Sequence, residues 1–139
     1  MKKGDEFKKI AIKAALKGGE FLQKFQGKFI WIGYKGVINL VTEADRLSED
    51  AIIKIIRKNF PEHNILTEES RGYEKGSDYK WIIDPLDGTT NYAHGFPVYC
   101  ISIALGKKGE IISGVVYNPV LEELFVAEKN KGAFMNGKR

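Results

Sequence analysis

Cysteine is almost absent from this chain, because Cys100 is the only one among 139 residues. No disulfide can therefore form within the chain. Cys100 lies in the apolar run 98–105, where a buried and inert thiol is expected rather than a nucleophile or a metal ligand. Histidine is also scarce, and His63 and His94 lack the spacing of metal ligands, so surface or interface roles are expected for both.

Long apolar runs are missing as well. No stretch approaches the roughly 20 apolar residues that span a bilayer. The N-terminus begins Met1-Lys2-Lys3-Gly4-Asp5-Glu6 and leads into an amphipathic pattern without the apolar segment of a secretory signal. The sequence therefore predicts a cytoplasmic protein with no membrane association.

The charge is modest, with a net value of +4, and it is not concentrated in one segment. Nucleic-acid binding would need a basic face or a known motif, and neither is visible. The lysines are scattered and fall mostly on the polar faces of two expected helices. We therefore expect solvated faces and no nucleic-acid partner.

Apolar periodicity predicts two long helices near the N-terminus. The first extends from about 5 to 26, and Gly18-Gly19 is expected to permit close packing against it. Residues 29–32 and 36–41 are interpreted as a hairpin with its turn near 33–35. The second helix is expected to start at Thr42 as its N-cap and to end before Pro61.

The rest of the chain is interpreted as short strands separated by turns. They are expected at 64–68, 80–84, 98–107, 110–117, 123–128 and 132–135, with a tight hairpin at Lys108-Gly109. The predicted fold class is α+β, with two helices on one face of an antiparallel β-sheet. The length suits a single compact unit over residues 1–139.

The richest segment for chemistry is Trp81-Ile-Ile-Asp-Pro-Leu-Asp-Gly-Thr-Thr-Asn91, where an apolar strand leads into two carboxylates. Pro85 disfavours helical backbone at Asp84, so Asp84 is expected at the strand end with Asp87 facing the same point. Gly88 permits close approach of a ligand, and Thr89 opens a helical turn whose free N–H groups attract an anion. Carboxylates facing such donors suit Mg²⁺ and a phosphate.

Asp-Pro-x-Asp-Gly is also an ordinary surface turn, because the same residue types dominate turns. That alternative is weakened by two further apolar runs that end in acid. These are Leu40-Val-Thr-Glu-Ala-Asp45 and Ile65-Leu-Thr-Glu-Glu-Ser70. Asp45 would then fall in the first turn of the second helix, where a carboxylate often does no more than complement the helix dipole.

Taken in order, these motifs resemble those of the inositol monophosphatase family, part of a superfamily of Mg²⁺-dependent, lithium-sensitive sugar phosphatases. The resemblance covers nearly the whole chain. Asp84-Pro-Leu-Asp-Gly-Thr-Thr-Asn91 matches the family's first signature, and Glu68-Glu69 and Val41-Thr-x-x-Asp45 lie at the expected places before it. The likeness continues through Gly95-Phe-Pro97, Gly114-Val-Val-Tyr-x-Pro119 and Lys131-Gly-Ala-Phe-x-Asn-Gly137.

The resemblance implies a role for each matching residue. Glu68, Asp84 and the main-chain carbonyl of Leu86 would ligate one Mg²⁺, and Asp84 with Asp87 would ligate a second. Glu68 and Thr89 would position the attacking water. Asp45 would be hydrogen-bonded to Thr89 and would help to take the proton. The N–H groups of Gly88 and Thr89 would hold the phosphate.

One part of the family pattern has no counterpart in these residues. The later Trp-Asp-x-Ala-Ala-Gly signature, whose aspartate completes the second metal site, is absent. The resemblance thus implies the N-terminal, metal-binding α+β half of the family's α/β/α/β/α layered sandwich, with the C-terminal half absent. The chain would be a shortened form of a full phosphatase, one half of a two-chain enzyme, or a non-catalytic descendant that binds a metal or a protein.

The expected activity is Mg²⁺-dependent hydrolysis of a small phosphorylated substrate, a sugar or inositol phosphate. Fructose 1,6-bisphosphate and nucleotide 3′-phosphates stay open as alternatives, since the discriminating residues lie mostly in the half without a counterpart. The family is commonly dimeric, and residues 91–99 resemble part of that interface. A homodimer is therefore expected, with a separate C-terminal half as the other possible partner.

Overall fold

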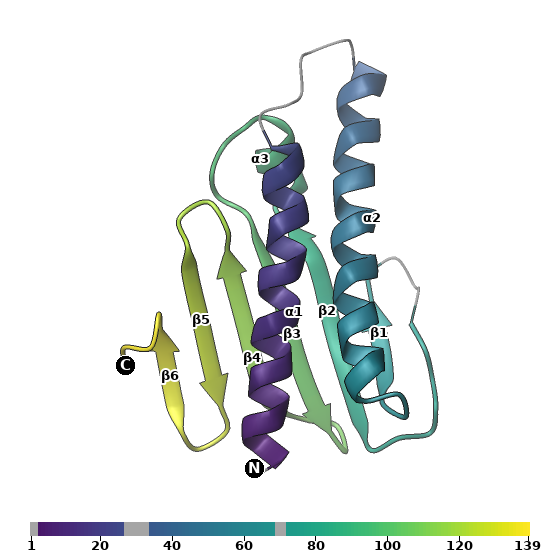
Figure 1. Ribbon diagram of the computed structural model, residues 1–139, viewed down its shortest axis with the longest axis vertical. Helices are drawn as coiled ribbons and strands as arrows, with labels where there is room; N and C mark the ends of the chain where they lie inside the picture. Colours follow the sequence, from purple (N-terminus) through teal and green to yellow (C-terminus); the bar gives the residue numbers. More distant parts are fainter. Residues whose placement is uncertain (1–2, 27–33, 69–71) are drawn as a thin grey trace.

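Two long helices lie side by side on one face of a six-stranded sheet, and a short third helix follows the second strand (Figure 1). The computed structural model describes residues 3–26, 34–68 and 72–139. The helices are α1 (Lys3–Phe25), α2 (Tyr34–Asn59) and α3 (Thr89–Ala93). The strands are β1 (Asn64–Thr67), β2 (Tyr79–Asp87), β3 (Cys100–Lys107), β4 (Glu110–Asn118), β5 (Glu123–Glu128) and β6 (Gly132–Met135).

The strands follow one another across the sheet in chain order, from β1 at one edge to β6 at the other. Every neighbouring pair is antiparallel except β1 and β2, which are parallel. The predicted α+β class with two helices on one face is confirmed. The parallel pair makes the sheet mixed rather than wholly antiparallel, and it requires the chain after β1 to return to the other end of that strand.

The glycines of α1 allow the close packing that the sequence predicted. A Cβ atom added at Gly18 would lie 2.8 Å from Ser48 Oγ and 2.9 Å from Ile52 Cδ1, both on α2. A Cβ atom at Gly19 would lie 2.6 Å from the ring of Tyr117 on β4. A side chain at either position would therefore force these neighbouring side chains or α1 itself to shift.

The predicted hairpin before α2 is wrong where the structure describes it. Residues 29–33 lie outside the described part, but Tyr34–Val41 are helical, so no strand forms at 36–41. Thr42 is consequently inside α2 rather than its N-cap, and Asp45 is not in the first turn. The physical reason is in the sequence, because Val37, Leu40 and Val41 continue the spacing of the later apolar stripe toward the N-terminus, and strand propensity is the weaker signal.

An aromatic cluster packs in the core where the N-terminal end of α1, the C-terminal end of α2 and the start of β2 meet. The ring of His63 stacks on Phe60 at 4.8 Å and on Tyr79 at 4.7 Å, and Phe7 packs edge-on against it. Trp81 Nε1 donates a hydrogen bond to His63 Nδ1 at 2.9 Å. Burial lowers the pKa of His63 below its ordinary value of 6.5, which favours the neutral ring that this hydrogen bond requires.

The two faces of the sheet differ sharply. The face toward α1 and α2 carries buried side chains such as Ile83, Ile103 and Val115. The opposite face is called here the uncovered face, because no element of the described residues packs on it. Strand alternation and the strand register place these residues on it: Leu66, Ile82, Asp84, Ser102, Ala104, Gly114, Val116, Phe125, Ala127, Ala133 and Met135.

No helix of the described residues is long and apolar enough to cross a membrane.

Candidate metal and phosphate site

Three of the predicted carboxylates lie near one another at the C-terminal ends of β1 and β2. Because β1 and β2 are parallel, their C-terminal ends lie at the same edge. Thr67 pairs with Ile83, so Glu68, the next residue along, is brought beside Asp84. Asp87 ends β2, and all three side chains are at least partly open to solvent.

The protonation of Asp84 reflects this crowding. Partial burial and the neighbouring charge of Glu68 raise the pKa of the Asp84 carboxyl from 3.8 to about 6, and the charge of Asp87 contributes in the same direction. A hydrogen bond with Glu68 also favours the protonated form, whereas the Leu86 N–H lowers the pKa. Mutual repulsion of this kind is relieved when a cation binds among the carboxylates.

The strand does not end at Asp84 as predicted but continues to Asp87 through an irregularity. Asp84 pairs with Ser102 and Asp87 with Cys100, so β2 has one more residue than β3 over this interval. Two hydrogen bonds stabilise the bulge. Ser48 Oγ on α2 donates to the carbonyl of Pro85 at 3.0 Å, and the Leu86 N–H donates to Asp84 Oδ1 at 3.3 Å.

Gly88 connects this bulge to α3, and the backbone conformation and close packing at this position require glycine. Its φ of 97° lies in the left-handed region, and an added Cβ would lie 3.0 Å from the carbonyl oxygen of Val98. Thr89 begins α3 immediately after it and is exposed. The predicted helical opening after Gly88 is therefore confirmed, although the cap is glycine with no side-chain hydrogen bond.

The short helix α3 is attached firmly to the core on its other side. Tyr92 is fully buried, and its hydroxyl donates to the carbonyl of Leu22 on α1 at 2.6 Å. Its ring packs edge-on against Tyr99 with centroids 4.9 Å apart. The side-chain amide of Asn91 donates to the carbonyl of Val98 at 2.7 Å. These contacts fix the position of the Gly88–Thr89 turn relative to the strands.

The helix α2 brings a further group of polar side chains toward the site. Ser48, which holds the bulge at Pro85, is fully buried. Asp45 lies one turn before Ser48 on the same helix face and is partly buried. Glu49 is 1% exposed, and neither Ser48 nor Glu49 was predicted from the sequence as a site residue. The interruption of an apolar stripe by Ser-Glu was the signal that could have marked them.

Cys100 lies beside the carboxylates rather than deep in the core. It is partly buried, and burial together with the charges of Asp87 and Asp84 raises the pKa of its thiol to about 11. A thiol with this pKa stays protonated at neutral pH. The predicted inertness of Cys100 is thus supported, through charge repulsion as well as burial.

The donor set fits a hard cation in its chemistry. Carboxylate oxygens and a main-chain carbonyl are the ligands that Mg²⁺ prefers. In the described part of the chain, however, no three His, Cys, Asp or Glu side chains are gathered closely enough to hold an ion. Glu69, the second acid of the predicted pair, lies outside the described residues. An ion would have to draw the carboxylates of Glu68, Asp84 and Asp87 inward.

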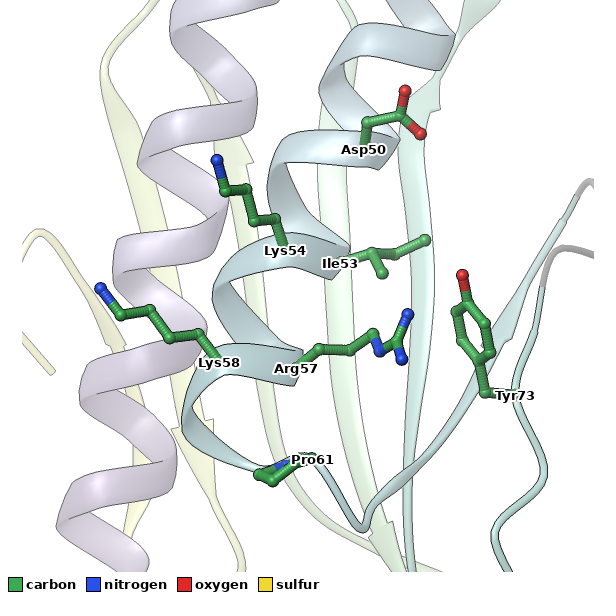
Figure 2. Close-up of a pocket in the computed structure, with 7 residues that line it drawn as sticks. All are labelled: Asp50, Ile53, Lys54, Arg57, Lys58, Pro61 and Tyr73. Carbon is green, nitrogen blue, oxygen red and sulfur yellow. The ribbon is translucent and has the colours of Figure 1, made fainter.

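A separate pocket of about 470 Å³ lies on the C-terminal half of α2 (Figure 2). The guanidinium of Arg57 lies 4.4 Å from the ring centre of Tyr73, whereas Lys54 and Lys58 point away from that ring (Figure 2). None of the predicted site residues lines this pocket. Its basic side chains do not converge on one point, so we do not place the phosphate there.

Comparison with known proteins identifies the class to which this fold and these acidic strand ends belong. An inositol monophosphatase from Anabaena (Nostoc) superposes with a TM-score of 0.84 at 41% identity, covering 99% of this chain and 49% of that structure. The chain also matches the Inositol monophosphatase family over residues 3–139. The chain belongs to the inositol monophosphatase family.

Individual relatives carry names from the same family. Inositol monophosphatase 2 of Solanum lycopersicum is 45% identical over 139 residues, covering 96% of this chain and 52% of that protein. A fructose-1,6-bisphosphatase/inositol-1-monophosphatase of Aquifex aeolicus is 42% identical over 136 residues, again with 96% and 52% coverage. The chain thus spans about half the length of the curated relatives it matches.

Proposed function

We propose that this chain supplies the metal-binding half of an Mg²⁺-dependent phosphomonoesterase acting on a sugar or inositol phosphate. The observation that carries the proposal is that Asp84 lies near Glu68 and Asp87 at the C-terminal ends of β1 and β2, where burial and then their charges raise the pKa of its carboxyl to about 6. Membership in a family of phosphatases supports the reaction class.

The proposed metal ligands follow from the family resemblance and agree with the arrangement of the strands. Glu68, Asp84 and the carbonyl of Leu86 hold one ion, and Asp84 with Asp87 holds a second. Bound Mg²⁺ lowers the pKa of a coordinated water and offsets the charge of the phosphate. The hydrogen bonds from Ser48 Oγ to the Pro85 carbonyl and from the Leu86 N–H to Asp84 Oδ1 fix the short segment that carries both proposed ligands, Asp84 and Leu86.

Proton transfer and phosphate binding are assigned to the neighbouring residues. Glu68 and Thr89 position the attacking water, and Asp45, carried on α2 near the bulge, orients the Thr89 hydroxyl. The N–H groups of Gly88 and Thr89 bind phosphate oxygens. The left-handed backbone at Gly88 supports this assignment indirectly, because it lets the turn into α3 pack against Val98 and so fixes where the two N–H groups lie.

The substrate is defined only as a class. Inositol 1-phosphate is the first candidate, and the name of the Aquifex aeolicus relative favours fructose 1,6-bisphosphate as the second. A nucleotide 3′-phosphate is a third member of the same chemical class. The contrasting hypothesis is a non-catalytic half-domain that binds a metal or a protein without turnover.

We also propose a homodimer in the cytoplasm, with activity sensitive to lithium as in the family. Phe96 and Val98 are exposed in the segment that resembles the family interface. Asn118 links this segment to Leu121, which is also exposed: its Nδ2 donates to the carbonyl of Pro97 at 3.3 Å, and its Oδ1 accepts from the N–H of Leu121 at 3.1 Å. Such an apolar patch favours association.

Phosphate release distinguishes the two functional hypotheses. The purified chain is assayed with inositol 1-phosphate and fructose 1,6-bisphosphate, with and without Mg²⁺, beside Asp84→Asn. We expect weak Mg²⁺-dependent release that Asp84→Asn abolishes, because the variant loses a ligand proposed for both ions. Equal release by both proteins would contradict the proposed site, and no release by either would favour the non-catalytic hypothesis for this chain alone.

A further inference from the structure

A buried hydroxyl on α2 is linked to the carboxylate of Asp84 through a single peptide unit. Ser48 Oγ donates to the carbonyl of Pro85 at 3.0 Å, and the Leu86 N–H donates to Asp84 Oδ1 at 3.3 Å. The Pro85 carbonyl and the Leu86 N–H belong to the same planar amide group. Because a rotation of that plane moves both hydrogen bonds together, the hydroxyl of Ser48 constrains the group that donates to Asp84.

The bulge makes this peptide unit dependent on a side chain. Between the pairs that Asp84 and Asp87 form with β3, the two residues Pro85 and Leu86 stand opposite a single residue. A regular ladder of main-chain hydrogen bonds fixes each peptide plane of a strand, but a bulge disrupts the ladder locally. The hydroxyl from α2 supplies the Pro85 carbonyl with a partner that does not depend on the ladder.

Burial and close packing hold the Ser48 hydroxyl in place. Ser48 is fully buried and Leu86 is 1% exposed, so solvent does not compete for the hydrogen bond between them. A Cβ atom added at Gly18 on α1 would lie only 2.8 Å from Ser48 Oγ. The missing side chain at Gly18 therefore leaves the space that the hydroxyl occupies. The contact between α1 and α2 sets the position of the hydroxyl and, through it, the peptide beside Asp84.

We infer that Ser48 is a positioning residue for the cation site, which acts through the 85–86 peptide to hold Asp84 and Leu86 in place before a cation binds. Without the hydroxyl the buried Pro85 carbonyl loses a partner, and the peptide can rotate. Groups that orient metal ligands in this way contribute roughly 10- to 100-fold to metal affinity. The inference rests on the proposed function where it concerns Mg²⁺, whereas the positioning of the peptide is a property of the metal-free chain.

Two variants remove the hydroxyl or displace it. Ser48→Ala deletes it, and Gly18→Ala crowds it. Ser113→Ala is the matched control for the first, because Ser113 is a buried serine on β4 whose Oγ has no hydrogen-bond partner in the described part of the chain. Gly19→Ala is the control for the second, because its Cβ would press on the ring of Tyr117 rather than on Ser48. Circular dichroism melts establish that each variant is folded.

The first readout needs no metal. Amide hydrogen exchange of the metal-free proteins is followed by NMR at Leu86 and at Ile103, which lies on a strand paired on both sides. Relative to Ile103, we expect exchange at Leu86 to be about tenfold faster or more in Ser48→Ala and Gly18→Ala, and unchanged in the controls. A general loss of stability would raise exchange at Ile103 at least as much. An unchanged ratio of the two rates in Ser48→Ala would overturn the inference.

The second readout is a calorimetric titration with Mg²⁺. We expect binding to be about tenfold weaker or more in Ser48→Ala and Gly18→Ala than in the wild-type chain, and unchanged in the two controls. Equal affinities of the wild-type chain and Ser48→Ala would overturn the inference. No saturable binding by the wild-type chain would contradict the proposed function instead, and exchange at Leu86 would then decide alone whether Ser48 positions the peptide.

Discussion

The charged form of the Asp84 carboxyl is unfavourable in the folded protein. It is a carboxylate placed beside two others and partly removed from water, which raises its pKa to about 6. Residues that destabilise the unliganded fold in this way are typical of functional sites. The cost should be measurable without any assay of activity.

Asp84→Asn is expected to stabilise the metal-free protein. The folded state binds the proton of Asp84 more tightly than the unfolded state, whose pKa is near 3.8, so its charge is a cost above about pH 6. At pH 7 the variant should be more stable by on the order of 1 kcal/mol, a figure reduced for solvent screening. The gain should shrink as the pH falls from 6 toward 4.

Urea unfolding of both proteins at several pH values without metal measures this difference in the free energy of unfolding. The titration of His63 affects both proteins equally and so cancels in the comparison. Asp78→Asn, at an exposed position just before β2, is the control for removal of one negative charge. A variant that is less stable than the wild type at pH 7 would contradict the account of the acidic site.

Gly88→Ala should destabilise the protein by about 1–3 kcal/mol through a combination of backbone strain and collision. The backbone φ at 88 is 97°, and a Cβ there would press on the carbonyl of Val98. Gly95→Ala is the matched control, because its φ is also positive, at 71°, but an added Cβ meets nothing within 4 Å. Thermal melts that show equal losses for both variants would exclude a role for the close approach to Val98.

At the scale of residues, the sequence predicted the acidic motif of the site but not the buried side chains on α2 that lie behind it. The spacing of Asp84, Asp87 and Gly88 predicted the carboxylates and the turn, because local backbone chemistry decides both. Ser48 and Glu49 were missed, since a polar residue in a helix has no local signature of burial. Their position depends on how α2 packs against β2, which is a tertiary property.

At the scale of elements, the contact between α1 and α2 links the core to the site. Gly18 allows α2 to approach closely, and Ser48 at that contact donates to the Pro85 carbonyl in the bulge. The helix contact and the shape of the site therefore share one buried hydroxyl.

Gly18→Ala should destabilise the protein although alanine is the better helix former by about 1 kcal/mol. The added Cβ would lie 2.8 Å from Ser48 Oγ, and Ser48 can move only by losing its hydrogen bond to Pro85. We expect a net loss of about 1–3 kcal/mol by chemical denaturation. Gly4→Ala in the same helix, where the nearest atom is 3.4 Å away, should be neutral or stabilising. A larger loss of stability in Gly4→Ala than in Gly18→Ala would contradict the close packing described at Gly18.

The helices and strands were predictable where the apolar periodicity and the turn residues indicated the same boundaries. The strands from β3 to β6 were predicted nearly to their ends, because turn residues such as Lys108-Gly109 mark them. The start of α2 was not, since Gly36–Val41 suits a strand by composition and a helix by its spacing with later residues. The parallel pairing of β1 and β2 was also missed, because strand direction depends on a connection whose route local sequence does not determine.

At the scale of the whole molecule, one face of the sheet is built for burial and the other is left open beside the acidic edge. The covered face packs on α1 and α2, and the uncovered face carries half of the exposed large apolar side chains of the described residues. From this asymmetry and the half-length match to relatives, we propose that this chain binds a cation without full turnover.

The most direct measurement of the central claim is a calorimetric titration of the 139-residue chain with Mg²⁺, beside Asp84→Asn. The account predicts saturable binding by the wild-type chain, weaker at pH 5 than at pH 7 because protons compete for Asp84, and at least tenfold weaker in the variant. Identical titrations of the two proteins would show that Glu68, Asp84 and Asp87 do not form a cation site.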